Sequence, residues 1–375
     1  MLLLTTTRDA LLAPLQSVAG IVEKRHTLPI LSNVLLSAQG GSLEMKATDL
    51  DLEVTEATAA GVEQGGATTV PAHLLYEIVR KLADGAEVML KTDESGNSMS
   101  VISGRSSFKL QCLPQSDFPE LSAGSFSHIF RLDSQALKAL IEKTQFAIST
   151  EETRYYLNGI YFHTVDVSDA GTVLRAVATD GHRMARAEIE APAGAAGMPG
   201  IIVPKKTVGE VQKLLDGAEG DVSVEVSDTK IRFTVGSVVL LSKLIEGTFP
   251  DYDRVTPKNN DKQMNVDRAS FATAVDRVST IASERGGKAV KLQARDGLLE
   301  LSVTNPDHGT ASEELAVEFD TDGFEIGFNA RYLLDIIGQI RSDSAIFMFN
   351  DAGSPTLVKD EGETRALYVL MPMRV

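Results

Sequence analysis

The sequence contains no tryptophan, a single cysteine and few aromatic residues, and it lacks any long apolar run. Only 6% of its 375 residues are aromatic. Cys112 alone cannot form an internal disulfide, so nothing in the chain requires an oxidising compartment. No signal-peptide pattern opens the chain, and no apolar stretch approaches the roughly 20 residues of a membrane span. We therefore expect a cytoplasmic protein whose core is filled mainly by aliphatic side chains.

Sequence signatures of catalysis and of metal or cofactor binding are also missing. The six histidines are scattered, and no His-Glu-x-x-His motif, paired cysteines or complete nucleotide-binding fingerprint occurs. The segment 283–288 only hints at a phosphate loop, because Ala289 stands where Ser or Thr is required. The segment 180–183, Asp-Gly-His-Arg, is the best catalytic-looking cluster. We expect no catalytic site, no metal and no cofactor, and we keep an enzyme as the less favoured alternative.

The composition is that of an ordinary globular protein with a strongly acidic balance. Hydrophobic residues make up 43% of the chain and charged residues 23%, and the length suggests two or three domains. The net charge of −16 by itself argues against a nucleic-acid partner, because DNA is a dense polyanion. How the charge is distributed along the chain therefore matters more than its sum.

Three copies of one pattern organise the chain. A segment of alternating apolar and polar residues ends in Thr-Asp at 42–49, and similar segments end in Thr-Asp at 173–180 and in Thr-Asn at 297–305. Alternation of this kind predicts half-buried strands. The threonines of the three copies are separated by 131 and 125 residues. The Thr-Asp of the catalytic-looking cluster thus recurs without a histidine, which favours a structural role at a strand end.

A second marker repeats with nearly the same period. Val-Pro at 70–71, Val-Pro at 203–204 and Phe-Asn at 328–329 each precede an amphipathic stretch, at intervals of 133 and 125 residues. Two independent markers with similar periods make coincidence an unsatisfactory explanation.

Each copy also opens with a stretch whose apolar residues recur at spacings of three and four, which predicts a helix. Either Asp133 or Ser134 could cap the second of these helices, and Asp267 the third. Pro14 lies within the first, so a late start or a kink is expected there.

These markers predict an α+β fold of three repeated domains, each with two helices and two small antiparallel sheets. We place the domains at 1–123, 124–256 and 257–375. Phe-Pro motifs close the first two copies. The Gly-, Pro- and Ala-rich segment 191–200 is expected to be a connecting loop inside the second domain.

The predicted helices carry charge of opposite sign to the rest of the chain. The spans 7–25, 72–83, 134–148, 204–216, 267–285 and 329–341 have balances of +1, +1, +1, +1, 0 and +1. They carry +5 together, so the remainder carries −21. One excess positive charge is ordinary for a surface helix, but its recurrence over the repeats is suggestive. If the helices line a common surface, a basic bore could hold DNA while the acidic outside repels it.

Several short motifs then point to a family. They are Thr-Leu-Pro-Ile-Leu at 27–31, Thr-Thr-Val-Pro-Ala at 68–72, Arg-Tyr-Tyr-Leu-Asn-Gly at 154–159, Thr-Asp-Gly-His-Arg at 179–183, Phe-Pro-Asp-Tyr at 249–252 and Met-Pro-Met-Arg at 371–374. From end to end and in this order, the chain resembles the bacterial beta sliding clamp, the beta subunit of DNA polymerase III. That family consists of ring-forming processivity factors that have no catalytic site.

The resemblance implies a head-to-tail homodimer in which two chains of three clamp domains close a ring around double-stranded DNA, independently of its sequence. By family position, Phe108 and Leu110 of the first domain should meet Ile281 of the third at the dimer interface. The implied partners are the DNA polymerase III alpha subunit, the clamp loader and other replication or repair proteins, which bind through short linear peptides.

The resemblance also implies a hydrophobic peptide-binding cleft between the second and third domains. A chain end of Met-Pro-Met fits such a cleft, because it offers adaptable apolar side chains where a mobile tail is more often polar. The alternative is that the tail simply closes the last sheet, and it could do both. The matching positions are Arg154, Leu157, Thr179, Gly181, His182, Arg183, Met184, Pro250, Arg254, Val255, Val369, Leu370, Met371, Pro372, Met373 and Arg374.

For DNA contact, the family positions carry over best to Arg25 and Lys206, with Tyr155 and Tyr156 nearby. To the same set we add two basic residues of the predicted helices, Arg80 and Lys138. A peptide-binding scaffold that never meets DNA remains the second alternative, since the repeat and the apolar tail suit it while the basic bias of the helices does not.

Overall fold

The computed structural model describes residues 1–23, 27–168, 171–282, 289–295, 297–321 and 323–375. Contacts between residues divide the chain into two compact units. The first unit comprises Met1–Gln135, Pro192–Met198 and Lys206–Leu244, and the second comprises Ala136–Ala191, Pro199–Lys205 and Ile245–Val375.

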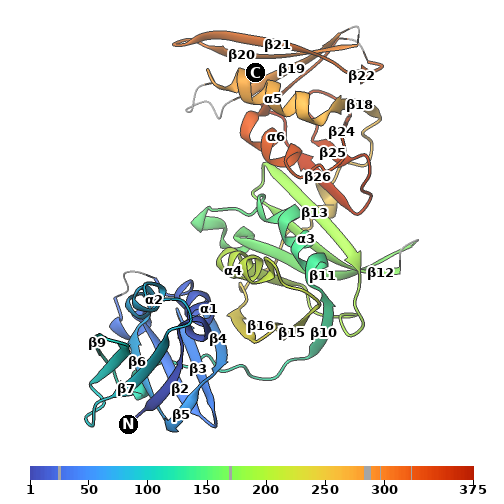
Figure 1. Ribbon diagram of the computed structural model, residues 1–375. Helices are drawn as coiled ribbons and strands as arrows, with labels where there is room; N and C mark the ends of the chain where they lie inside the picture. The colour runs from blue at the N-terminus through green and yellow to red at the C-terminus, as the bar shows by residue number, and fades with distance from the viewer. Residues whose placement is uncertain (24–26, 169–170, 283–288, 296, 322) are drawn as a thin grey trace. The chain divides into compact units, whose positions relative to one another are not determined.

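The first unit contains two antiparallel sheets (Figure 1). The five-stranded sheet has the order β5 (Gly61–Gln64), β1 (Leu3–Thr7), β7 (Glu87–Thr92), β8 (Ser98–Ser103) and β9 (Ser106–Gln111). The eight-stranded sheet has the order β10 (His128–Asp133), β15 (Asp221–Val226), β16 (Lys230–Val235), β17 (Val238–Lys243), β4 (Leu52–Ala59), β3 (Ser42–Thr48), β2 (Asn33–Gln39) and β6 (Gly66–Pro71).

The second unit also contains two antiparallel sheets. The nine-stranded sheet has the order β14 (Ile201–Pro204), β11 (Gly159–Val167), β12 (Gly171–Thr179), β13 (Arg183–Glu190), β26 (Ala366–Leu370), β25 (Thr356–Asp360), β24 (Ser344–Phe349), β18 (Lys262–Asp267) and β22 (Glu318–Phe319). The four-stranded sheet has the order β21 (Gly309–Ala316), β20 (Leu298–Asn305), β19 (Ala289–Arg295) and β23 (Phe324–Asn329).

Helices cover one face of the sheets in each unit. Within the first unit, α1 packs on α2 and on strands β3 and β4, and in the second α5 packs on α6 and on strands β20 and β21 (Figure 1). The α-helices of the described residues are α1 (Arg8–Ala19), α2 (Ala72–Arg80), α3 (Ser134–Gln145), α4 (Lys205–Leu215), α5 (Arg268–Ser279) and α6 (Ala330–Ile337). Short 3-10 turns lie at η1 (Pro29–Ser32), η2 (Gln115–Asp117), η3 (Glu152–Leu157) and η4 (Tyr252–Arg254).

The three alternating segments of the sequence form strands β3, β12 and β20, and each copy also contains two helices. Both observations confirm the sequence repeat. The predicted small sheets, however, are not confined to single repeats. Strand β4 of the first repeat pairs with β17 of the second, and β13 of the second pairs with β26 of the third. Antiparallel pairing across each junction covers strand edges that would otherwise be exposed. The sheets of neighbouring repeats therefore merge, which is why the second repeat is divided between the two compact units.

Local predictions had mixed outcomes. Asp267 caps α5, and the Asp133 side chain accepts a hydrogen bond from the Gln135 backbone N–H at the start of α3. The expected late start of the first helix is wrong, because α1 begins at Arg8, where Thr7 caps it, and continues through Pro14. The segment 191–200 is a connecting loop, as expected. Among the described helices, none is both long and apolar enough to cross a membrane.

Replacing Asp267 by Ala should lower the local stability of α5, because the variant loses the N-cap. Hydrogen bonds from the Ser270 side chain and backbone hold the pKa of Asp267 below its usual value of 3.8. Its contribution is therefore present at neutral pH and is lost as the pH falls through the lowered pKa. Hydrogen exchange of the first-turn amides measures it. Asp276→Ala, at an exposed position of the same helix, is the control, and equal protection in both variants would contradict the capping role.

Candidate functional site

A tight turn between β12 and β13 contributes neighbouring residues to the predicted cleft. The Thr179 hydroxyl donates to the carbonyl of Arg183 at 2.7 Å and accepts from the N–H of Gly181 at 3.1 Å. One oxygen of Asp180 accepts from the N–H groups of His182 and Arg183, at 2.9 and 3.0 Å. Gly181 has a φ of +86°, a left-handed conformation that glycine adopts without strain. Thr179 and Asp180 thus determine the shape of the turn.

The first repeat contains the same turn between β3 and β4. The Thr48 hydroxyl donates to the carbonyl of Leu52 at 2.9 Å, and an Asp49 oxygen accepts from the N–H of Leu52 at 2.8 Å. Leu50 takes the place of the glycine and has a φ of +82°. Because an identical hydrogen-bond pattern forms without a histidine, the Asp-Gly-His-Arg cluster is a structural turn. Its carboxylate is occupied by backbone donors, as the recurrence in the sequence predicted.

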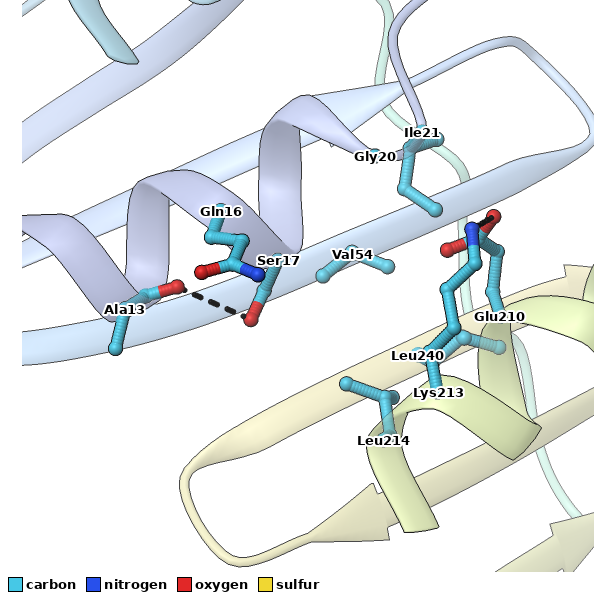
Figure 2. A pocket seen from close by; sticks show the side chains of 10 residues that line it. All are labelled: Ala13, Gln16, Ser17, Gly20, Ile21, Val54, Glu210, Lys213, Leu214 and Leu240. Carbon is cyan, nitrogen blue, oxygen red and sulfur yellow. Dashed lines mark hydrogen bonds and ion pairs between the residues drawn. The ribbon is translucent and has the colours of Figure 1, made fainter. Parts of the chain in front are cut away.

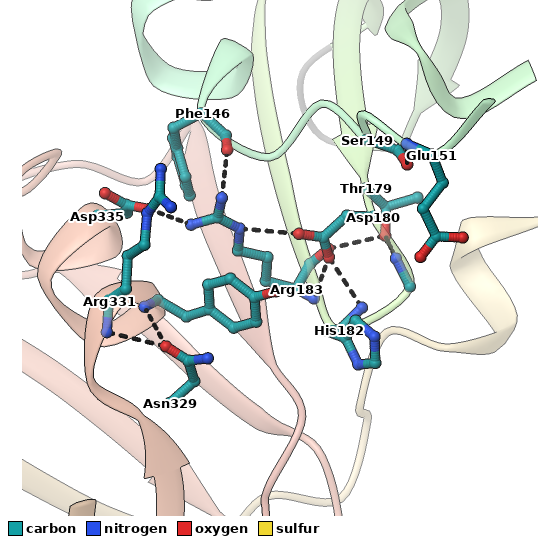
Figure 3. Close-up of polar contacts among 12 residues, drawn as sticks. Phe146, Ser149, Glu151, Thr179, Asp180, His182, Arg183, Asn329, Arg331 and Asp335 are labelled. Atoms are coloured by element: carbon teal, nitrogen blue, oxygen red, sulfur yellow. Dashed lines mark hydrogen bonds and ion pairs between the residues drawn. The ribbon is translucent and has the colours of Figure 1, made fainter. Parts of the chain in front are cut away.

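Arg183 is buried and joins the turn to two other elements of the second unit. Figure 3 shows its guanidinium between Asp180, Asp335 of α6 and the carbonyl of Phe146. The distances are 3.1 Å to Asp180 and 2.6 Å to the Phe146 oxygen. The guanidinium carbon also lies 4.3 Å from the ring centre of Tyr332 and 5.2 Å from that of Phe146. Arg suits this position better than Lys, because its planar guanidinium holds several donors in a fixed geometry and stacks on aromatic rings.

Arg154 approaches the same turn at Gly181. It makes a two-pronged ion pair with Glu151, at 2.7 and 2.5 Å, and this pair holds the pKa of the Glu151 carboxyl below its usual range. A Cβ at Gly181 would lie 2.7 Å from Arg154 Nη1, the end of a flexible side chain that would have to shift to make room. The left-handed φ of Gly181 is therefore the stronger reason for glycine at that position.

The second unit also contains an apolar cluster. Leu157, Met184 and Val369 of the predicted cleft are buried in it, and partly buried Tyr156, Tyr161, Ile245 and Met348 pack against it. The sequence alone did not indicate the other buried members of the cluster, which are Val177, Ile202, Phe249, Tyr252, Leu357 and Leu367. A signal existed for two of them. Val177 and Leu367 lie two residues before Thr179 and Val369, and this spacing places side chains on the same face of a strand.

The segment after β17 runs alongside this cluster and lines a groove of about 530 Å³. Arg254, Val255 and Met371, all predicted cleft residues, lie together in its wall. Val255 is 57% exposed, and Arg254 is exposed while paired with Asp251 at 2.9 Å. A groove that offers exposed apolar and charged groups can bind a chain that presents both kinds of side chain.

The C-terminal tail is held in place at two points. The N–H of Met371 donates to the carbonyl of His182 at 2.9 Å, and the N–H of Met373 donates to the carbonyl of Gly327 at 2.7 Å. Met371 nevertheless remains 39% exposed. The tail thus extends the sheet structure and still presents an apolar side chain at its surface.

The predicted DNA-contact residues fall in both units. Arg25 lies outside the described residues. Lys206 has ion pairs with Asp49 and, at 3.4 Å, with Glu23; burial opposes its charge, but these carboxylates outweigh burial and raise its pKa. The remaining members are exposed or paired: Arg80 with Glu77, Lys138 with Glu142, and Tyr155 in a T-shaped contact with Tyr156.

The predicted dimer residues also differ in exposure. Phe108 is 37% exposed, whereas Leu110 of the same strand is buried and Ile281 is half-buried.

A separate pocket of about 430 Å³ lies between α1 and α4 in the first unit, over Val54 and Leu240 (Figure 2). None of the predicted site residues lines it. Among the described residues, no group of three or more His, Cys, Asp or Glu side chains could hold a metal ion.

Family models for the DNA polymerase III beta subunit match the chain in three parts. The N-terminal domain matches residues 2–122, the central domain 131–251 and the C-terminal domain 253–374. A beta sliding clamp of Caulobacter vibrioides is 51% identical over 372 residues, which cover 99% of this chain and 100% of that one. The beta sliding clamp of Escherichia coli is 38% identical over 374 residues, or 99% of each chain.

Solved structures give the same result over the whole chain. The DnaN sliding clamp of Bartonella birtlesii bound to griselimycin has a TM-score of 0.96 and 55% identity, with complete coverage of both chains. A DNA polymerase sliding clamp from Caulobacter crescentus also has a TM-score of 0.96, with 50% identity and complete coverage of both.

Replacing Arg183 by Ala should lower the free energy of unfolding of the second unit by about 3 kcal/mol, because Asp180 and Asp335 then lose their buried cation. Arg183→Lys keeps the charge but not the fork or the ring contacts, so an intermediate loss is expected. Chemical denaturation measures both. Arg331→Ala is the control: Arg331 is 79% exposed and lies 3.9 Å from the same Asp335, so its loss should stay within about 1 kcal/mol. Equal losses from Arg183→Ala and Arg331→Ala would contradict the role of Arg183.

Proposed function

Because the chain belongs to the family of DNA polymerase III beta subunits, the beta sliding clamps, we propose that it encircles duplex DNA as a ring and tethers the replicative polymerase there. Members of this family are processivity factors and not enzymes. The match to all three family domains in order carries the proposal.

The proposed ring consists of two chains, each with domains at 1–123, 124–256 and 257–375. Two sheet edges support a head-to-tail joint, because in the described residues β9 pairs only with β8 and β21 pairs only with β20. Pairing of β9 with the β21 of a second copy is a contact between different surfaces, which generates a ring when the rotation closes. Exposed Phe108 on β9 supplies apolar surface, and Lys109 on β9 would face a strand that carries Glu314.

The charge distribution supports DNA as the molecule inside the ring. The helical spans carry +5 and the rest of the chain carries −21, so a helix-lined bore would attract phosphates and the outside would repel them. Pairing with Asp49 and Glu23 weakens the attraction that Lys206 can offer. At physiological salt the Debye length is about 8 Å, so a wide bore would bind the phosphates only softly.

Soft binding suits a protein that must slide. Non-specific phosphate contacts give dissociation constants of about 10⁻⁴–10⁻⁶ M at physiological salt, which is too weak to retain a protein for long. A closed ring makes residence depend on ring opening instead, and weak contacts then permit movement along the duplex.

The cleft of the second unit is the proposed site for partner peptides. The turn at 179–183, the apolar cluster and the exposed Met371 together offer apolar and polar contacts to a short linear segment. Tethering by such a segment raises the effective concentration of the DNA polymerase III alpha subunit at the template. The clamp loader and other replication or repair proteins would use the same cleft. We place this activity in the cytoplasm, where bacterial DNA is replicated.

Loading onto nicked circular plasmid by a clamp loader tests the ring. The chain should remain bound to the circle and should leave within the dead time of a filtration assay once the plasmid is cut, because linear DNA has ends from which a ring can slide. Uncut plasmid carried through the same steps is the control. Equal retention on both forms would mean ordinary surface binding, and no retention on either would favour a peptide-binding scaffold without DNA.

Deleting residues 371–375 tests the cleft. The deletion removes the contacts of Met371 with His182 and of Met373 with Gly327, so calorimetric titration with griselimycin, which is bound to the Bartonella relative, should show no binding. The dimer should persist in sedimentation. Phe108→Ala is the matched variant and should do the reverse, weakening the dimer while griselimycin still binds. Unchanged griselimycin affinity after the deletion would refute the cleft assignment.

A further inference from the structure

A polar row crosses three strands of the nine-stranded sheet in the second unit. His163 on β11 lies opposite Arg175 on β12, and Arg175 lies opposite Glu188 on β13. Directly opposite residues of an antiparallel pair project from the same face of the sheet. Arg175 is buried and donates from Nε to Glu188 at 2.8 Å. A buried arginine with one carboxylate partner still has donors to satisfy.

The hydroxyl of Tyr252 satisfies one of those donors. Arg175 Nη1 donates to the Tyr252 oxygen at 2.9 Å, and the same oxygen lies 2.9 Å from His163 Nε2. A neutral imidazole that carries its proton on Nδ1 accepts on Nε2, and in this tautomer the Tyr252 hydroxyl, which accepts from the donor-only guanidinium, donates its proton to His163. The hydrogen bonds therefore run in one direction, from Arg175 to Tyr252 to His163.

The backbone of Tyr252 organises the segment that lines the groove. Its carbonyl accepts from the N–H groups of Val255 and Thr256, at 3.2 and 3.1 Å, and from the Thr256 hydroxyl at 2.9 Å. These bonds close the 3-10 turn that carries Arg254. Tyr252 itself is only 5% exposed. One residue thus connects the polar row on the sheet with the turn that presents Arg254 and Val255.

The polar row lies apart from the residues that would touch a peptide. On the same face, the next row contains Tyr161 and Val177, and the row after it contains Thr179, Met184 and Val369 of the cleft. Two residues along a strand span about 7 Å, so the polar row is two such steps from the cleft.

We infer that Tyr252, anchored by Arg175 and His163, is a positioning residue that holds the segment 250–256 in the geometry the peptide cleft requires. This inference rests on the proposed function of the cleft. It assigns a role to three residues that do not line the groove, and it makes cleft affinity depend on the acceptor at His163.

Acid should loosen this anchor. Burial and the neighbouring Arg175 lower the pKa of His163 from its usual value of 6.5, while Asp253 of the segment opposes the shift. Tyr161 stacks on the imidazole at 4.6 Å, and Glu188 lies on the far side of Arg175. Protonation removes the acceptor for the Tyr252 hydroxyl and places a second cation beside Arg175. The anchor is therefore intact at neutral pH and fails as the pH falls through the lowered pKa of His163.

Calorimetric titration of the full-length chain with griselimycin tests the inference. Tyr252→Phe removes only the hydroxyl and should weaken affinity roughly tenfold at neutral pH, the change expected when buried donors lose a partner. His163→Gln keeps an acceptor that does not titrate, so its affinity should match the wild type at neutral pH and stay level on acidification, whereas wild-type affinity falls. Tyr76→Phe on α2 of the first unit is the control, because it removes a tyrosine hydroxyl from a residue outside both the polar row and the apolar cluster.

The possible outcomes distinguish failure of the positioning role from failure of the cleft itself. A wild type that binds griselimycin, together with a Tyr252→Phe variant of equal affinity, would overturn the positioning role and leave the cleft standing. Identical pH profiles for the wild type and His163→Gln would overturn it in the same way. A wild type that binds no griselimycin at any pH would overturn the proposed cleft and this inference with it.

Discussion

Backbone pairing between β13 and β26 is the constraint on which the candidate site depends. The register sets Met184 opposite Val369 and Arg183 opposite Leu370, so residues from two sequence repeats share one face of one sheet. A slip of one residue would turn every side chain of β26 to the other face. The apolar cluster, the anchored tail and the turn at 179–183 all inherit their positions from this pairing. The chain thus builds a site at a junction by completing the sheet across it.

Buried arginines then hold the elements that cover this sheet. Arg183 connects the turn with α6, and Arg175 connects β13 with the segment that contains Tyr252. Removing a guanidinium from water is costly unless its donors are satisfied, and here each has a carboxylate and at least one neutral acceptor. Both side chains act in the same way: the fixed donors of one guanidinium form hydrogen bonds with acceptors from separate segments of the chain.

Weak electrostatics and strong backbone pairing serve different parts of the proposed function. Retention on DNA would come from closure of a ring through strand edges, which needs ordered hydrogen bonds. Sliding needs contacts that exchange rapidly, and a basic residue already paired with carboxylates, such as Lys206, provides only a mild field. The acidic surplus outside the helices would keep the outer surface from competing for the same DNA.

The sequence by itself determined the repeat and the main strands and helices, because these follow from periodic patterns and local motifs, whereas the cleft residues were proposed from the family resemblance. The alternation before Thr48, Thr179 and Thr304 predicted β3, β12 and β20, and the N-cap at Asp267 was visible from residue type. Only the tertiary structure decided that sheets merge across repeats, since strand pairing between distant segments leaves no local signal. For the same reason, only the tertiary structure showed that Asp335 lies beside Arg183 and that Tyr252 bonds to His163 and Arg175. These contacts span up to 152 residues and depend on strand register and burial rather than on adjacent residues in the sequence.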